Sequence, residues 1–247
     1  MLNMYVFATA LGLASAAAVA AAAVAPTYPP LAVLKAFRLV VQVTERSTSN
    51  DFASIHNTYI SNIRTGHQGH DLLGQTENAD KALTFYLNGT TTAQEYMRVL
   101  TESTTSVSSG IRLDPDEGSR TVRTAYLIEG AADVGFSLKH PSENYAFLHP
   151  ETWAACKEKL PLDKDREVIV FKQAITTTSH MFGTVDQNIP KGCVSVRLLP
   201  ECANLNDLPK FSSYLPEQIT PSHQHVLGSH CYKDVKAIDW SKYGPGP

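Results

Sequence analysis

The stretch from residue 192 to 202 limits the possible folds of this chain more than any other. Its apolar residues Val194, Val196 and Leu198 alternate with polar ones, which is the pattern of a β-strand with one buried face. A cysteine stands at each end of the alternating run, so half of the four cysteines in the chain flank one predicted strand. We therefore expect this strand to be where disulfides tie the fold together.

All four cysteines lie in the second half of the chain, at Cys156, Cys193, Cys202 and Cys231. An even number of cysteines in an exported chain predicts two disulfides, with three possible pairings. We favour Cys156–Cys193 with Cys202–Cys231, because the long coil after Cys202 gains most from closure, and the two other pairings stay open. No Cys-x-x-Cys motif is present, and bridged cysteines are not available as nucleophiles.

The first 25 residues carry no charged side chain and are dominated by alanine. Small residues gather at the end of this run and prolines follow it, as in a secretory signal peptide with several cleavage points. The run lacks a basic start and is long enough to cross a bilayer, so a retained anchor and a buried helix are the alternatives. We predict that residues 1–25 are a signal peptide, cut at Ala25 or a few residues earlier, and that the mature protein is secreted and leaves the membrane.

The remaining residues, 26–247, have the length of a single domain with a core of its own. The net charge of the chain is −3 and no basic run occurs, so nothing indicates nucleic acid or an anionic membrane as partner. We predict one secreted β-rich domain with a coil-rich tail from about residue 204.

Short strands are predicted through most of this domain by apolar residues at alternate positions. They lie at residues 37–43, 83–87, 120–128, 134–138, 168–171, 181–185 and 193–202. The run 168–171 is apolar throughout, which is typical of a central strand covered on both faces. Asn88-Gly89 predicts a two-residue hairpin turn. Residues 52–63 fit a helix and a strand equally well.

Two short helices are predicted beside these strands. Thr92 to Glu95 fits a capping box, and Tyr96, Val99 and Leu100 supply the buried face of the helix. Residues 150–160 begin with Pro-Glu and place Trp153, Cys156 and Leu160 on one helical face. The predicted fold class is therefore all-β or β-rich α+β: an antiparallel, sandwich-like single domain with two short helices and two disulfides.

Three segments together resemble a known family. They are residues 85–90 (Phe-Tyr-Leu-Asn-Gly-Thr), residues 192–203, and residues 231–243, in which Cys-Tyr-Lys-Asp-Val is followed by Ile-Asp-Trp-Ser-Lys-Tyr. The arrangement is similar to secreted proteins of filamentous ascomycete fungi grouped as a domain of unknown function. The resemblance covers roughly residues 36–243. It implies fungal secretion and a β-rich fold, and it offers no catalytic residue to carry over.

The sequence contains one N-x-[ST] sequon, Asn88-Gly89-Thr90. An Asn-Gly pair at an exposed hairpin tip can accept a glycan in a secreted protein, so Asn88 is a predicted glycosylation site. The same residues are also what an unmodified turn prefers.

Histidines cluster twice, and these are the candidates for a metal site. The first cluster is His67 with His70, and the second is His223, His225 and His230. Zinc or copper needs imidazoles that converge on one point, whereas histidines flanked by glycine and serine are more often solvated loop residues. We predict no metal and no cofactor, and keep a histidine-based metal binder as an alternative function.

Carboxylates give the remaining chemical hypotheses. Asp114, Asp116 and Glu117 lie within a Pro- and Gly-containing segment, which is typical of a turn and offers calcium a weaker possibility. No G-x-S-x-G nucleophile elbow is present, and a glycosidase with two carboxylates far apart in sequence stays open. We predict no catalytic residues.

Aromatic residues supply the candidates for a binding face, because their rings stack on sugars and pack against proteins. They are Tyr86, Tyr96, Tyr126, Tyr145, Tyr214, Tyr232 and Trp240. The sequence thus favours a non-catalytic, effector-type extracellular binding domain whose ligand is a carbohydrate or a protein. The alternatives are a secreted carbohydrate-active hydrolase and a histidine-based metal-binding protein.

Overall fold

The computed structural model describes residues 28–44, 50–67, 69–90, 96–102, 107–139, 143–150, 152–160, 166–179, 184–207, 223 and 225–243. The predicted signal peptide, residues 1–25, lies outside this part of the chain. Among the described residues, no helix has the length and apolar character needed to cross a membrane.

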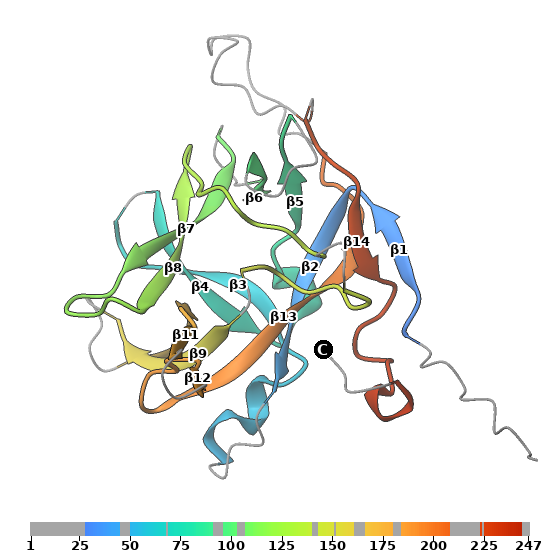
Figure 1. The fold of residues 1–247 in the computed structure, drawn as a ribbon. Helices are drawn as coiled ribbons and strands as arrows, with labels where there is room; N and C mark the ends of the chain where they lie inside the picture. Colours follow the sequence, from blue (N-terminus) through green and yellow to red (C-terminus); the bar gives the residue numbers. More distant parts are fainter. Residues whose placement is uncertain are drawn as a thin grey trace, which may run out of the picture.

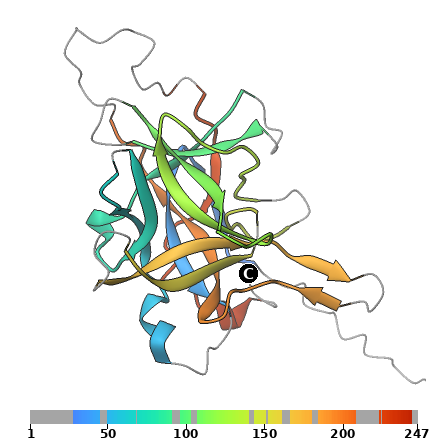
Figure 2. The same ribbon diagram turned by 90° about the vertical axis from the view of Figure 1, so that its left-hand side faces the viewer.

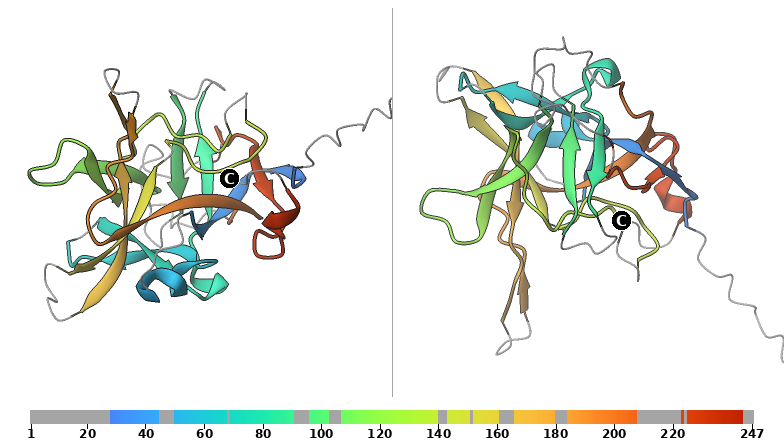
Figure 3. Two further views of the ribbon diagram at one scale, coloured as in Figure 1. Left: turned by 60° about the horizontal axis from the view of Figure 1, so that its bottom comes forward. Right: turned by 90° about the horizontal axis from the view of Figure 1, so that it is seen from above.

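Twelve strands of the described chain form one sheet (Figure 1). They are β1 (Leu31–Leu34), β2 (Ala36–Val43), β3 (Tyr59–Arg64), β4 (His70–Thr76), β5 (Phe85–Asn88), β6 (Arg98–Thr101), β7 (Ser109–Pro115), β8 (Val122–Glu129), β9 (Trp153–Lys159), β10 (Glu167–Ala174), β13 (Cys193–Ala203) and β14 (Ser229–Tyr232). Strands β11 (Thr177–Ser179) and β12 (Thr184–Asp186) form a separate arm that projects from the body (Figures 2 and 3). Among the described residues, the helical segments are 3-10 turns such as η1 (Asn50–Ile55), η2 (Ala79–Lys81) and η5 (Trp240–Lys242).

The sheet closes on itself twice. Pairing of β13 with β2 completes a ring of β2, β13, β9, β10, β8, β4 and β3, and pairing of β7 with β8 completes a second ring through β5 and β6. The two rings share β2, β3, β4 and β8. The predicted β-rich, mainly antiparallel fold is confirmed, but twelve of the described strands form one closed sheet rather than the two stacked sheets of a sandwich.

Strand β13 is central, as the sequence predicted. It pairs with β2 over eight positions and with β9 over four, and it meets β14 in parallel at Glu201. Its cysteines form the disulfides Cys156–Cys193, to β9, and Cys202–Cys231, to β14. These are the two pairs that the sequence analysis favoured. The strand is thus held on both sides by covalent as well as hydrogen bonds.

Both predicted helices are wrong where the structure describes them. Residues 153–159 form β9, and residues 98–101 form β6. Trp153, Cys156 and Leu160 are buried, as predicted, but so are Ala154 and Ala155. The first half of β9, residues 153–156, is buried on both faces, so its burial does not alternate there, and its apolar spacing imitates a helix.

Three further expectations need correction. The Asn88-Gly89 pair does not form a two-residue turn: Asn88 faces Arg98 across the β5–β6 pair and also bridges Val226, and Gly89 N donates to the carbonyl of His225 at 3.1 Å. Residues 134–138 contain an isolated bridge at Ser137 rather than a strand. The ambiguous segment 52–63 divides into part of η1 and β3.

The strand predictions at residues 37–43, 83–87, 120–128, 168–171 and 193–202 hold in position. Of the predicted strand 181–185, residues 181–183 lie outside the described residues, and Thr184 and Val185 belong to β12. Residues 168–171 lie in β10, where Val170 and Phe171 are fully buried while Val168 and Ile169 are half-buried. The predicted tail contains β14 and η5 among its described residues. The largest apolar cluster fills the interior and includes Phe37, Phe85, Trp153 and Phe171.

Candidate functional site

Four aromatic rings gather where β1, β14 and η5 come together, at the right of Figure 1. Tyr28 meets Tyr145 edge to face with ring centroids 5.2 Å apart, and Trp240 lies 5.6 Å from Tyr232 and 6.3 Å from Tyr145. Such edge-to-face contacts stabilise aromatic clusters beyond the area they bury. The structure therefore brings together three of the seven aromatic candidates, Tyr145, Tyr232 and Trp240, and adds Tyr28.

Beside this cluster lies a groove of about 320 Å³, which we call the aromatic groove. It is lined by Pro29, Pro30, Tyr232, Lys233, Asp234, Ala237, Ile238, Asp239, Lys242 and Tyr243. Tyr232 is buried while Tyr243 is half-buried, so the Tyr243 ring retains surface for a ligand. Two lysines and two aspartates lie among the apolar lining. Ring faces together with polar groups that fix orientation are typical of a ligand site.

Buried hydrogen bonds hold this groove in shape. Tyr232 follows the disulfide-bonded Cys231, and its hydroxyl accepts a hydrogen bond from the backbone N–H of Ala146 at 2.9 Å. Glu201 of β13 accepts from the Tyr59 hydroxyl and from the backbone N–H of Val235, each at 3.0 Å. The groove is therefore built on the central strand, as a preformed site requires.

These buried phenols predict a loss of stability in alkali. Burial raises the pKa of Tyr232 to about 12, and burial with the nearby charge of Glu201 raises the pKa of Tyr59 to about 12. Both folded-state values exceed the unfolded value of about 10, so the unfolded chain releases these protons first. The stability they supply is complete below about pH 10 and is lost as the pH rises toward about 12. Urea unfolding across this range measures it.

A Tyr232→Phe variant tests the assignment of this alkaline loss. It removes one titrating phenol, so its free energy of unfolding should fall less steeply above about pH 10 than that of the wild type. At neutral pH the variant should be about 1–2 kcal/mol less stable, because the Ala146 N–H loses its buried acceptor. Equal alkaline slopes in the two proteins would contradict the role of Tyr232.

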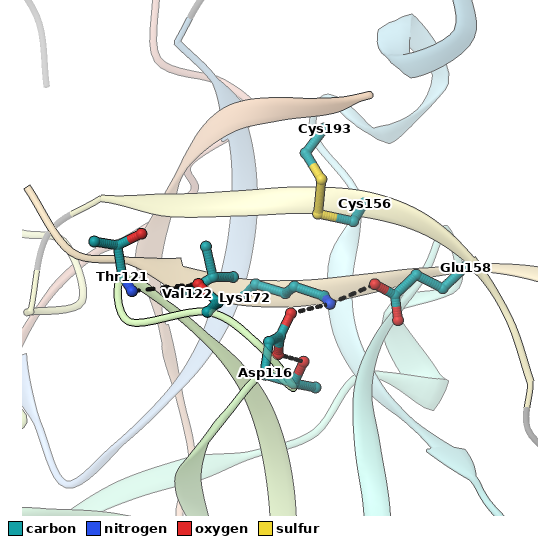
Figure 4. Close-up of polar contacts among 9 residues, drawn as sticks. Asp116, Thr121, Val122, Cys156, Glu158, Lys172 and Cys193 are labelled. Atoms are coloured by element: carbon teal, nitrogen blue, oxygen red, sulfur yellow. Dashed lines mark hydrogen bonds and ion pairs between the residues drawn. A yellow bond between two sulfur atoms is a disulfide. The ribbon is translucent and has the colours of Figure 1, made fainter. Parts of the chain in front are cut away.

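A second polar cluster surrounds Lys172 of β10 (Figure 4). The Lys172 ammonium lies 2.5 Å from Asp116 Oδ2 and 2.5 Å from Glu158 Oε1, and the Thr124 hydroxyl donates to Asp116 Oδ1. Burial alone lowers the pKa of Lys172, but the hydrogen bonds and charges of the two carboxylates outweigh it and raise that pKa overall. The cluster joins β9 and β10 to the turn between β7 and β8.

This arrangement argues against a glycosidase pair at Asp116 and Glu158. A retaining or inverting enzyme needs one carboxyl group to donate a proton and the other to attack or to activate water. Here both carboxylates are bound by the same ammonium group, which lies buried between them. The structure also accounts for the acidic segment seen in the sequence. Asp114 pairs with Arg112, and the backbone N–H of Ser119 donates to the Asp116 carbonyl to form a turn.

Glu102 organises a third cluster at the other end of the sheet. The Tyr86 hydroxyl donates to Glu102 Oε1 at 2.8 Å, His223 Nε2 lies 3.1 Å from the same oxygen, and Ser108 Oγ lies 3.0 Å from the Tyr86 hydroxyl. Burial raises the pKa of Tyr86. The residue types suggest a catalytic triad, but the serine hydroxyl bonds to Tyr86 and Glu102 rather than to a histidine base, which nucleophile activation requires.

The histidine candidates do not converge. Among the described residues, no three His, Cys, Asp or Glu side chains are placed to hold a metal ion. His223 lies against Tyr86 with ring centroids 5.5 Å apart, whereas His225 and His230 are exposed. His67 and His70 are also exposed, and their backbones pair with each other in the loop that begins β4.

The remaining candidates are scattered. Asn88 is half-buried in β5 rather than exposed at a turn, and its glycosylation stays a prediction. Tyr96 is 58% exposed, Tyr126 is half-buried in β8, and Tyr214 lies outside the described residues. None of the described residues among these candidates lines the aromatic groove.

Comparisons with known proteins agree with the fungal resemblance. A family model described as "Domain of unknown function (DUF7907)" matches residues 34–202. The chain belongs to this family. It is also similar to the "Antigenic protein SchS34" of the fungus Stachybotrys chartarum, with 39% identity over 231 residues that cover 92% of this chain and 99% of that protein. No solved structure matches the chain. The DUF7907 span includes the Lys172 cluster and ends before β14 and most of the aromatic groove.

Proposed function

We propose that this protein is a secreted, non-catalytic binding domain that holds an extracellular carbohydrate in the aromatic groove. The observation that carries the proposal is the groove itself, in which a partly exposed tyrosine ring stands among prolines and charged side chains. Tyrosine faces pack against the C–H faces of sugars, while lysine and aspartate bond to hydroxyl groups. The two disulfides and the absence of a membrane-spanning helix among the described residues are compatible with secretion.

The family carries no assigned activity, and the similar fungal protein is named for its antigenicity. The polar clusters of the described chain are held in internal ion pairs and hydrogen bonds rather than aimed at a shared open site. A binding role therefore fits the described chain better than hydrolysis or metal binding does.

Isothermal titration with soluble glucan, mannan and chitin oligosaccharides tests the proposal. We expect saturable binding of at least one class, and a loss of about tenfold in affinity for Tyr243→Ala, because a ring contact is worth about 1 kcal/mol or slightly more. Tyr96→Ala is the matched control, since Tyr96 is exposed and lies outside the groove.

Equal affinity of wild type and Tyr243→Ala would overturn the groove as the binding site. If no saccharide binds and a purified extracellular protein does so in a manner that depends on Tyr243, the ligand class is protein and the carbohydrate assignment is wrong. Hydrolysis products in the titration cell would overturn the non-catalytic assignment.

A further inference from the structure

Strand β1 is the one strand of the large sheet that pairs on a single side, as far as the described residues show. Its partner is β14, with Leu31 opposite Tyr232 and Leu34 opposite Ser229. Every other strand of this sheet has at least two partner strands, because the two rings are closed. Figure 1 shows β1 at the outer edge of the sheet. The outer edge of β1 is therefore open to a further strand.

The side chains of β1 are apolar, and most of them are exposed. Val33 is 58% exposed, Leu34 is 42% exposed, and Ala32 is exposed as well. Because neighbouring residues of a strand point to opposite faces, β1 presents apolar surface on both faces. Leu31 is half-buried against the apolar cluster that contains Tyr232.

Strand β1 lacks most of the features that keep edge strands from pairing with other chains. Protected edges carry charged side chains, prolines or bulges. The Leu-Ala-Val-Leu sequence of β1 contains no charge and no proline, and its register with β14 is continuous. Its short length is the one protective feature that remains. The edge can therefore add a partner strand, but only over a few residues.

A second copy of β1 fits this edge. Two copies related by a two-fold axis pair as antiparallel strands, and each residue then faces a residue whose side chain lies on the same face. With Val33 at the axis, Val33 faces Val33 of the second copy, and Ala32 faces Leu34. This register covers the three exposed residues of β1, and it places apolar side chains opposite apolar ones.

The ends of β1 fit the same register. Pro30 has no N–H to donate, and it lies outside the ladder when Val33 is at the axis. Lys35 faces Leu31, so no like charges meet across the pair. So few opposed residues bury less than the roughly 1,200 Å² at the lower end of stable interfaces, and the dimer is therefore a transient one.

We propose that the protein forms a weak, two-fold symmetric dimer in which β1 pairs with β1 of a second copy, with Val33 at the axis. Its dissociation constant is expected to be roughly 0.1 mM. Pro29 and Pro30 line the aromatic groove and directly precede β1. In the antiparallel pair the two copies of Pro30 lie on the order of 20 Å apart along the strands. The dimer thus brings two aromatic grooves close together on one face.

Sedimentation equilibrium of the secreted protein, from micromolar to millimolar concentration, tests the dimer. We expect the average mass to rise from that of a monomer toward that of a dimer. Val33→Lys should remain monomeric throughout, because two lysines would meet at the axis. Val185→Lys is the matched control, since Val185 is also an exposed strand valine, in β12, and it should dimerise as the wild type does. Circular dichroism establishes that each variant is folded.

A pair of variants with opposite charges tests the register. Val33→Glu alone should also remain monomeric. An equimolar mixture of Val33→Glu and Val33→Lys should dimerise at least as well as the wild type, because opposite charges then meet at the axis.

The dimer also predicts avidity, and this consequence rests on the function proposed above. At millimolar protein, a long soluble glucan or mannan that binds the groove should bind the wild type at least tenfold more tightly than Val33→Lys, because two grooves engage one chain. A short oligosaccharide of the same class should bind both proteins equally. Absence of all saccharide binding would overturn the aromatic groove but not the dimer, which sedimentation measures without a ligand.

Several outcomes would overturn the proposed dimer. They are a wild type that stays monomeric at millimolar concentration, or equal loss of the dimer in Val33→Lys and Val185→Lys. If the mixture of the two charged variants stays monomeric, β1 does not face β1 at Val33, and the pairing is wrong. A monomeric wild type that sediments with phosphatidylglycerol vesicles, in a manner that depends on Val33, would replace the second copy with a membrane surface.

Discussion

Removal of both disulfides is expected to destabilise the protein by about 7 kcal/mol. The bonds Cys156–Cys193 and Cys202–Cys231 close loops with sequence separations of 37 and 29 residues. In the chain-entropy model each loop of this length contributes somewhat less than about 4 kcal/mol. Because a domain is usually stable by only about 5–15 kcal/mol, the fully reduced protein should be marginally stable or unfolded at about 37 °C. Chemical unfolding with and without a strong reductant measures the difference.

Single-disulfide variants show whether the two bonds act equally. The loop lengths are so similar that Cys156→Ala/Cys193→Ala and Cys202→Ala/Cys231→Ala should cost nearly the same if chain entropy dominates. Only the second variant should also disturb the aromatic groove, because Cys231 adjoins Tyr232. A reduced protein that unfolds at the same denaturant concentration as the oxidised one would contradict the cross-linking role.

The sequence predicted best those strands in which apolar and polar residues alternate. In β13 and β8 apolar and polar residues alternate in the sequence, and both strands occur near the predicted residues. The prediction failed at β9, whose first four residues are all buried. Apolar residues do not alternate with polar ones where a strand has protein on both faces, as in the first half of β9.

Ring closure could not be predicted from the sequence. It depends on pairing between strands that are far apart in the sequence. Strand β2 pairs with β13, which lies about 150 residues later in the chain. The Asn88-Gly89 turn failed for a related reason. The strand that contains Asn88 is engaged by the distant Val226, a contact that local turn preferences do not include.

The candidate sites were predictable only in part. The aromatic candidates included Tyr145, Tyr232 and Trp240. Their spacing in the sequence could not show that these rings lie together in the fold. The Lys172 cluster was missed altogether. One signal was available: Lys172 directly follows the apolar run 168–171, and a lysine in a buried strand requires carboxylate partners.

The Lys172 cluster gives the second large prediction. Lys172→Met keeps most of the apolar stem but removes the ammonium group, so Asp116 and Glu158 would face each other without a cation. Loss of one partner from a buried ion pair costs about 3–5 kcal/mol. We expect about 3 kcal/mol here, because Glu158 is 38% exposed while Lys172 is only 9% exposed. Urea unfolding at neutral pH measures the loss. Lys242→Met is the control, because its pair with Asp239 is exposed at 72% and 51%, and its loss should leave the free energy of unfolding nearly unchanged.

Two further measurements separate charge from packing. Combining Lys172→Met with Asp116→Asn and Glu158→Gln should restore at least half of the lost stability, since no uncompensated charge then remains. The folded pKa of Lys172 is raised above 10.5, so the contribution of its charge is complete below that pH and is lost only as the pH rises through the folded value. The difference in free energy of unfolding between wild type and Lys172→Met should therefore stay constant near neutral pH and narrow in alkali. If the triple variant is no more stable than Lys172→Met, uncompensated carboxylate charge is not the cause of the loss, and the ionic account of this cluster is wrong.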